Sequence, residues 1–175
     1  MKLSPYMEST NILMNLSADE CSDCLIEMIR TVDDGLVRDR TELISATLSR
    51  EQLAPTGIGN GIAIPHTMTD AIKKAVLLIG RSRTGIDFFA SDGRPARLIF
   101  LVLAPRSKRP LFFSLMSAII KLMREEDASP TMLSAGDPAD IIAYIRAYEH
   151  HNFLGNLKQG SIIEPVLSGA RGLLL

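Results

Sequence analysis

The residues with the clearest chemical potential lie in the stretch PTGIGNGIAIPHT, Pro55 to Thr67. His66 follows Pro65 at the end of a short apolar run, and an unprotonated imidazole is a nucleophile near neutral pH. Glycine takes positive φ and leaves N–H groups uncovered, as an anion-binding loop requires. The stretch predicts a phosphate-handling histidine, with a structural histidine as the alternative. The loop residues that would shape such a site are Thr56, Gly57, Gly59, Asn60 and Gly61.

A nucleotide-binding enzyme is the competing interpretation of the same glycines. The letters GIGNGI lack the G-x-G-x-x-G spacing of a dinucleotide fingerprint and the Gly-Lys-Ser/Thr of a P-loop. That fingerprint also needs a strand before it, a helix directly after it and an acidic ribose contact. The sequence shows none of this pattern, so we expect no organic cofactor.

Metal or redox chemistry is the second alternative, because Cys21 and Cys24 form a CxxC motif. A lone CxxC supplies half of a tetrahedral metal site, and the adjacent His150 and His151 point different ways on a helix. The thiols instead continue a helical apolar stripe with Leu25, Met28 and Ile29. We therefore interpret them as small apolar residues and expect no metal.

Composition limits the class of protein. The 175 residues are 46% hydrophobic, enough for one domain with a sizeable core, and the net charge of -1 offers no general attraction for nucleic acid or an anionic membrane. No apolar run approaches the ~20 residues that span a bilayer, and the N-terminus lacks the apolar region of a secretory signal. We expect a cytoplasmic protein without membrane insertion.

Helical periodicity predicts helices at residues 17–31, 40–52, 110–123 and 138–149. The capping-box pattern from Ser17 to Glu20 is expected to open the first. In the second, Glu42 and Arg50 lie off the apolar face, free for solvent or a site, and Pro110 suits the first turn of the third. The apolar face of the second helix comprises Leu43, Ile44, Thr47 and Leu48.

Short apolar runs predict strands at residues 61–65, 75–80, 85–90 and 97–104. The turn-forming sequence from Ser91 to Gly93 predicts an antiparallel hairpin between the last two. Because the run from Leu98 to Leu103 is uninterrupted, that strand should be covered on both faces. The predicted fold is a three-layer α/β/α sandwich, with a mixed sheet of about five strands and helices on both faces.

We divide the chain into a domain at residues 1–150 and a C-terminal extension at residues 151–175. Glycine and proline interrupt the extension, which ends in three leucines. This end is expected to pack on the domain, on a partner or on a second subunit.

The segment SREQLAPTGIGNGIAIPHT, Ser49 to Thr67, closely resembles the active-site signature of the enzyme IIA domains of the bacterial phosphotransferase system, in the fructose/mannitol and nitrogen-regulatory family. The resemblance extends more loosely over residues 8–150. It implies that His66 accepts a phosphoryl group from an HPr-type phosphocarrier, or its nitrogen-branch homologue. It also implies that Arg50 stabilises the phosphoryl oxygens and that Gly57 to Gly61 shape the loop.

The sequence departs from that family near the predicted third helix. Members usually carry a second histidine there, in a His-Leu pair that supports the phosphorylated ring, whereas this chain has Pro110 before Leu111. Proline offers neither donor nor charge, so Lys108 or Arg109 would have to compensate. A smaller departure is Thr67, where the family often has glycine.

Three functional interpretations follow from the resemblance. The preferred one is a stand-alone regulatory protein of the nitrogen branch that is phosphorylated and signals through protein contacts, because the glycine loop resembles that branch most and no attached IIB or membrane IIC segment is seen. The alternatives are a sugar-specific carrier that passes the group to a IIB component, and a degenerate binding module that keeps the fold without efficient phosphorylation.

Overall fold

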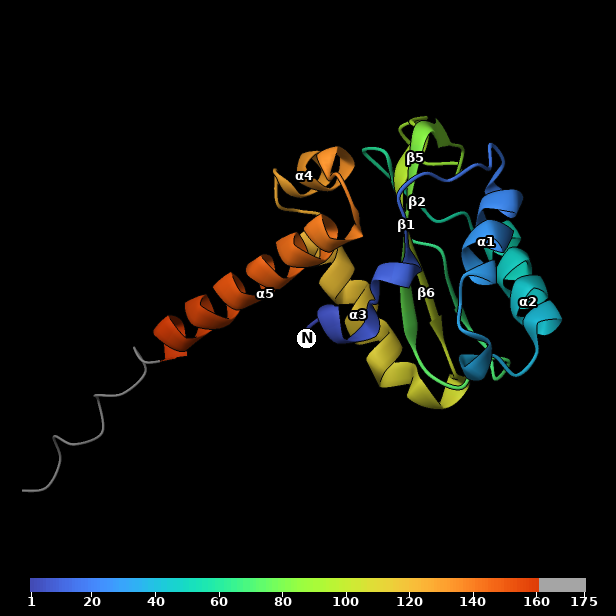
Figure 1. Cartoon of the computed structure of the whole chain (residues 1–175), viewed down its shortest axis with the longest axis horizontal. Coiled ribbons are helices and arrows are strands. Elements are labelled where there is room, and N and C mark those ends of the chain that lie inside the picture. Colours follow the sequence, from blue (N-terminus) through green and yellow to red (C-terminus); the bar gives the residue numbers. More distant parts are fainter. Residues whose placement is uncertain (161–175) are drawn as a thin grey trace, which may run out of the picture.

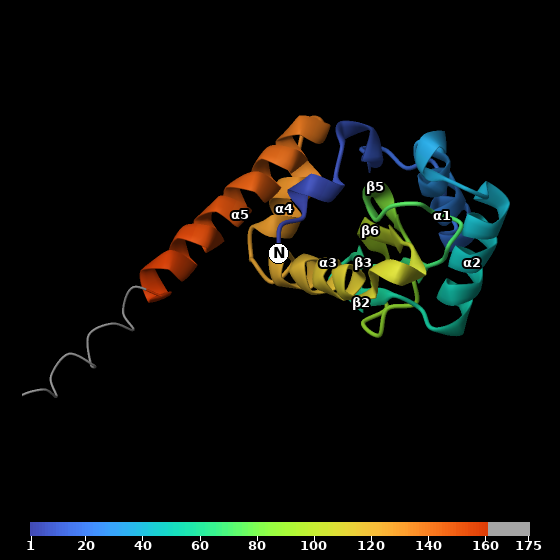
Figure 2. The same ribbon diagram turned by 90° about the horizontal axis from the view of Figure 1, so that it is seen from below.

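The computed structural model describes residues 1–160, including the side chains of residues 1–152. A twisted sheet forms the middle layer, and helices cover both of its faces (Figure 1, Figure 2). The first face carries α1 (Cys21–Arg30) and α2 (Arg40–Leu53). The opposite face carries α3 (Arg109–Leu122), α4 (Ala128–Ser134) and α5 (Pro138–Gly160). The predicted three-layer α/β/α sandwich is confirmed.

The sheet is mixed and contains six strands within the described residues, in the order β1-β5-β6-β3-β2 with β4 also paired to β6. β6 is the central strand: it pairs antiparallel with β5 and parallel with β3 and β4. The strands are β1 (Ile12–Leu13), β2 (Gly57–Gly59), β3 (Ile62–Ala63), β4 (His66–Met68), β5 (Val76–Ile86) and β6 (Ala96–Ala104).

The side chains of β6 fill two separate half-cores. Phe100 and Val102 point into the cluster with α3, α4 and α5, whereas Ile99 and Leu101 point into the cluster with α1 and α2. Alternate residues of a strand face opposite sides of the sheet, so a strand buried on both faces needs apolar residues throughout. This confirms the prediction drawn from the uninterrupted apolar run.

The predicted hairpin exists, but the predicted bounds of its first strand were wrong. Residues 75–80 and 85–90 do not form two strands, because β5 runs without a break to Ile86 and leaves residues 87–90 in a loop. β5 and β6 pair from Val76 opposite Leu103 to Ile86 opposite Ala96, with an irregularity in the register after Arg81. The irregularity allows the polar residues 81–84, which suggested a break between two strands, to lie within one continuous strand. The predicted turn is present, and Gly93 N donates to the carbonyl of Ala90 at 3.0 Å.

The predicted capping box at the first helix is also wrong. α1 begins at Cys21, and its N-cap residue Glu20 makes no side-chain capping bond. Ser17 instead donates its backbone N–H and its hydroxyl to the carboxylate of Glu27, at 3.1 and 3.0 Å. Glu27 lies in the last turn of α1. Its carboxylate binds Ser17, which the capping-box pattern predicted to interact with Glu20.

The bounds of α2 and α3 agree with the prediction within one residue at each end. Asp39 caps α2 by accepting the backbone N–H of Glu42 at 2.9 Å, and Pro110 lies in the first turn of α3. The sequence analysis did not predict α4 or the short 3-10 helices. The latter are η1 (Ser4–Tyr6), η2 (Ser9–Asn11), η3 (Asp34–Leu36) and η4 (Arg106–Lys108).

The last helix is longer than predicted, since α5 continues through residue 150 to Gly160 and extends away from the body (Figure 1). The N-terminal segment is fastened to it by Glu149, whose carboxylate accepts the backbone N–H groups of Leu3 and Ser4. The predicted packing of the terminal leucines falls outside the described residues.

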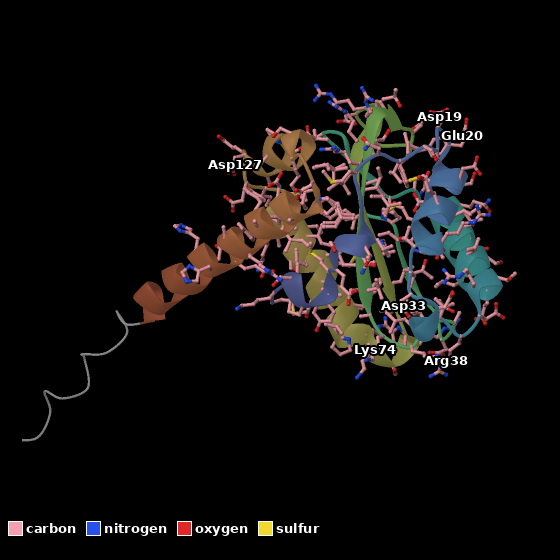
Figure 3. The ribbon with its side chains drawn as sticks, in the orientation of Figure 1. Asp19, Glu20, Asp33, Arg38, Lys74 and Asp127 are labelled. Atoms are coloured by element: carbon pink, nitrogen blue, oxygen red, sulfur yellow. The ribbon has the colours of Figure 1, made fainter. Side chains whose placement is uncertain are left out.

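Charged side chains project from the surface at many points, for example at Asp19, Arg38, Lys74 and Asp127 (Figure 3). Within residues 1–160, we find no helix that combines the length and the apolar character needed to cross a membrane.

Candidate functional site

His66 lies where two short strands meet. β3 ends at Ala63 and β4 begins at His66, and both run parallel to β6. Pro65, which has no N–H to donate, occupies the gap, and its carbonyl accepts the N–H of Val102 at 3.0 Å. The break therefore stays anchored to the central strand. It presents a half-buried imidazole at the start of β4.

The hydrogen bonds of the ring distinguish its two nitrogens. Nδ1 lies 2.8 Å from the carbonyl of Ile64, which can only accept, so Nδ1 carries the proton. Nε2 lies 2.8 Å from Nη2 of Arg50, which can only donate, so Nε2 presents its lone pair. The structure thus brings together Arg50, from the last turn of α2, and His66, and it makes Nε2 the nucleophilic atom. Arg50 is held in turn by the carbonyl of Ala54, which accepts from Nη1 at 2.8 Å.

The surroundings keep this imidazole uncharged. Burial is the largest influence and lowers the pKa of His66 below its usual 6.5, because desolvation disfavours the charged form. The carbonyl of Ile64 opposes this, the Arg50 guanidinium lowers the pKa further and the Glu51 carboxylate raises it. The net effect is a lowered pKa, so the ring is neutral and nucleophilic at pH 7.

The start of α3 contributes an aromatic wall rather than a polar group. The ring of Phe112 meets the imidazole edge-on, with 5.6 Å between centroids. The guanidinium of Arg109 lies over the ring of the next aromatic residue, Phe113, at 5.6 Å, and both Lys108 and Pro110 are exposed. Among the described residues, the imidazole has hydrogen bonds only with Arg50 and Ile64. Neither basic residue therefore hydrogen-bonds the ring in this unphosphorylated state.

The glycine loop forms a tight β2–β3 hairpin. Its turn residues Gly59, Asn60 and Gly61 all have positive φ, at 89°, 54° and 74°, which explains the choice of glycine and asparagine. At Gly57 a Cβ would lie 2.6 Å from the carbonyl oxygen of Phe88, so a side chain cannot fit there.

The expectation that this loop offers free backbone donors is wrong for Gly57 and Asn60. The N–H of Gly57 donates to Phe88 at 3.1 Å, and the N–H of Asn60 donates to the Asp92 carboxylate at 2.8 Å. Asp92 comes from the β5–β6 connection, which the sequence did not place near this loop. These two amides are therefore not available to bind an anion.

Glu51 is a site residue that sequence analysis missed. Its buried carboxylate accepts the backbone N–H of Thr56 at 2.8 Å, and both of its oxygens accept the Thr56 hydroxyl, at 2.9 and 2.8 Å. This pair clamps the end of α2 to the base of the hairpin. The available signal was spacing, because Glu51 continues the buried face of Leu43 and Thr47 at intervals of four residues.

Thr67 is paired with Leu103 of β6, which faces the α1 and α2 side of the sheet. Its hydroxyl is buried and, within the described part of the chain, has no hydrogen-bond partner. A buried hydroxyl without a partner costs stability, so this position is energetically unfavourable as it stands.

Cys21 and Cys24 are free thiols that form no disulfide. Burial is the main cause that raises the pKa of Cys21 to about 12 and also raises the pKa of Cys24. Cys24 is buried, with Sγ 3.9 Å from the sulfur of Met28. Residues 1–160 contain no group of three or more His, Cys, Asp or Glu side chains arranged to hold a metal ion.

A model of the family described as "Phosphoenolpyruvate-dependent sugar phosphotransferase system, EIIA 2" matches residues 5–148. The fructose-specific EIIABC component of Bacillus subtilis is 31% identical over 150 residues, which are 85% of this chain but 24% of that protein. The fructose-specific EIIA component of Haloferax volcanii is 41% identical over 104 residues, covering 59% of this chain and 68% of that one. A nitrogen regulatory protein of Bradyrhizobium diazoefficiens is 26% identical over 145 residues, 83% of this chain and 95% of that one.

Solved structures share the architecture. The nitrogen regulatory protein IIA-Ntr of Neisseria meningitidis superposes with a TM-score of 0.76 at 20% identity, over 82% of this chain and 98% of that one. The mannitol-specific IIA of Escherichia coli, in complex with phosphorylated IIB, gives a TM-score of 0.70 at 19% identity, over 81% and 97%. At these identities the likeness shows the fold alone. The family model, which spans residues 5–148, confirms the resemblance carried by the segment from Ser49 to Thr67: the chain belongs to the EIIA 2 family of the phosphoenolpyruvate-dependent sugar phosphotransferase system.

Proposed function

We propose that Nε2 of His66 accepts a phosphoryl group from the phosphohistidine of an HPr-type carrier. In this step the phosphorus–nitrogen bond of the donor breaks and a new one forms to Nε2, while the proton on Nδ1 stays in place. The observation that carries the proposal is the pair of ring contacts, which leaves the lone pair of Nε2 facing Arg50. The lowered pKa supports it, because only the neutral ring is a nucleophile.

Arg50 is the phosphoryl stabiliser in this proposal. Phosphoryl transfer depends mainly on positioning and on stabilising charge at the equatorial oxygens. The guanidinium already lies at the acceptor atom and presents a planar set of donors that suits two phosphoryl oxygens. When the group arrives, Arg50 exchanges its contact with Nε2 for contacts with these oxygens.

The experiment is phosphorylation with phosphoenolpyruvate, enzyme I and an HPr-type carrier, followed by intact-mass measurement at neutral pH. The chain contains three histidines, which provides matched controls. We expect one acid-labile phosphoryl group on the wild type and on His150→Ala and His151→Ala, and none on His66→Ala. A folded wild-type chain that gains no phosphoryl group would instead favour the degenerate binding module.

For the step after phosphorylation we propose nitrogen-branch regulation through protein contacts. The support is the likeness to a nitrogen regulatory protein, of which this chain covers 95% of the length. The second candidate is a sugar-specific carrier, favoured by the 41% identity to a fructose-specific EIIA component.

Incubating the phosphorylated chain with a fructose-class IIB protein separates the two roles. Rapid transfer to IIB would establish the carrier, and retention of the group on His66 would support regulation.

The cytoplasmic location stays a prediction.

A further inference from the structure

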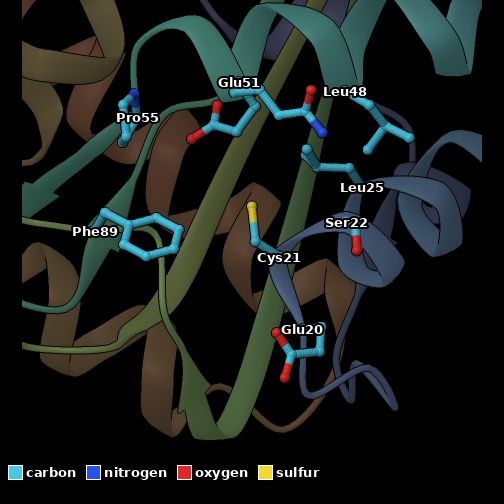
Figure 4. A pocket seen from close by; sticks show the side chains of 9 residues that line it. Glu20, Cys21, Ser22, Leu25, Leu48, Glu51, Pro55 and Phe89 are labelled. Carbon is cyan, nitrogen blue, oxygen red and sulfur yellow. The ribbon is translucent and has the colours of Figure 1, made fainter.

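A cavity of about 470 Å³ lies beside the acceptor site but does not include His66 or Arg50 among its lining residues. It opens between α1, α2 and the loop that follows β5 (Figure 4). Leu25 and Leu48 provide apolar walls, and Phe89 stands on the side opposite Cys21. An apolar concavity with a few polar groups is typical of a small-molecule site.

The charged side chains that line the cavity are both acidic. Glu20 and Glu51 line it, and the lining contains no lysine, arginine or histidine among the described residues. The carboxylates of Glu51, Asp87 and Glu20 all add to the effect of burial in raising the pKa of the Cys21 thiol. Glu51 accepts hydrogen bonds from the backbone N–H and the hydroxyl of Thr56, which are both neutral donors.

Phe89 adds an aromatic face to this negative environment. This residue is 69% exposed although it is large and apolar, and its φ of 52° is unusual for a residue other than glycine. The Asp87 carboxylate accepts the backbone N–H of Phe89 at 2.7 Å and stabilises this conformation. The face of an aromatic ring attracts cations.

We propose that this cavity is a binding site for a small organic cation with an apolar body, such as a protonated arylalkylamine. The apolar body packs against Leu25 and Leu48, and the cationic group lies between the carboxylates and the ring of Phe89. The charge complementarity excludes an anionic ligand of the same shape, because two carboxylates would repel it.

Hydrogen bonds connect the cavity to the acceptor site. Glu51 holds Thr56, the carbonyl of Thr56 accepts the N–H of Ile64 at 3.1 Å, and the carbonyl of Ile64 holds Nδ1 of His66. A cation that attracts the Glu51 carboxylate therefore acts on the first member of a continuous hydrogen-bonded chain.

The test is a titration of the full, isotopically labelled chain with three probes of one shape, followed by amide NMR. The probes are 2-phenylethylammonium, the neutral 2-phenylethanol and the anionic phenylacetate. We expect saturable binding of the ammonium in the millimolar range, with shifts at Cys21, Glu51 and Phe89 that extend to Thr56 and Ile64. Equal binding of the anion, shifts confined to other surfaces, or no saturable binding of the ammonium would overturn the proposal.

Two pairs of variants sharpen the result. Glu20→Gln removes a charge at the cavity, whereas Asp23→Asn removes one from the exposed side of the same helix. Phe89→Ala removes the aromatic face but keeps a Cβ at the unusual φ, whereas Phe113→Ala removes an exposed ring outside the cavity.

We expect Glu20→Gln and Phe89→Ala each to weaken ammonium binding by about two- to fivefold, and both controls to leave it unchanged. The four residues are exposed, so thermal unfolding should show that every variant is folded. Equal binding by wild type, Glu20→Gln and Phe89→Ala would contradict the assigned site.

Discussion

Nη2 of Arg50 lies 2.8 Å from Nε2 of His66, although the two residues are 16 positions apart and belong to a helix and a strand. The same imidazole is fixed from its other side by the carbonyl of Ile64. One contact therefore joins the proposed acceptor atom to the proposed phosphoryl stabiliser.

Replacing Arg50 with alanine should slow phosphorylation by about ten- to a hundredfold, since a charge-assisted hydrogen bond is worth roughly 1.5 to 3 kcal/mol and 1.4 kcal/mol is about tenfold. The variant should also raise the pKa of His66, because the guanidinium lowers it. Rapid-quench phosphorylation and NMR titration of the imidazole measure the two effects. The control is Arg38→Ala, which removes an exposed arginine elsewhere on the surface. Wild-type kinetics in Arg50→Ala would rule out its role at the phosphoryl group.

Phosphorylation should depend on pH through His66. Because its pKa is lowered below 6.5, the neutral ring persists at neutral pH, and the rate should fall only as the pH drops through this lowered value. In the same window the unfolded chain binds a proton before the folded chain does, so the free energy of unfolding should decrease as the pH falls below about 6.5. Urea unfolding across this range measures the decrease in the free energy of unfolding. The substitution His66→Gln should remove the part of this decrease that His66 causes. A His66 pKa above 6.5 by NMR would contradict both expectations.

Two threonine-to-valine substitutions should differ in their effects on stability. Thr56→Val deletes the hydroxyl that both Glu51 oxygens accept and should lower the free energy of unfolding by about 1 to 3 kcal/mol. Thr67→Val deletes a buried hydroxyl without a described partner and should leave stability unchanged or raise it by about 1 kcal/mol. Urea unfolding compares the pair directly. Equal destabilisation by both would show that the Glu51–Thr56 clamp contributes nothing specific.

Pro110→His should increase the rate or extent of His66 phosphorylation. The first turn of α3 lies beside the site, where Phe112 contacts the imidazole, and a histidine there would add a donor that proline lacks. A charge-assisted hydrogen bond from it would favour the phosphorylated state by about ten- to a hundredfold. Intact-mass time courses of wild type and variant measure the change.

The basic residues beside Pro110 provide the control for this prediction. If Pro110→His folds normally and phosphorylates no better than wild type, while Lys108→Ala with Arg109→Ala abolishes transfer, the basic pair supports the phosphoryl group. In the unphosphorylated structure Arg109 stacks on Phe113, so this role would require it to move.

Much of the architecture could be predicted because its signals are local. The bounds of α2 and α3 follow from apolar spacing and from a proline in the first turn, and the buried β6 follows from an uninterrupted apolar run. The errors arose where local patterns competed with distant partners. Ser17 bonds Glu27 rather than Glu20, and the register of β5 against β6 joins two runs that read as separate strands.

The sequence by itself determined the candidate acceptor, its arginine and the glycine loop before it, because the segment from Ser49 to Thr67 carries these residue types at short separations. Only the tertiary structure decided which nitrogen of His66 faces Arg50, that Glu51 clamps Thr56, and that Asp92 takes the amide of Asn60. The physical reason is that a hydrogen bond depends on distance and direction in space. Packing α2 and the β5–β6 connection against the short strands sets both, and residue order does not encode them locally.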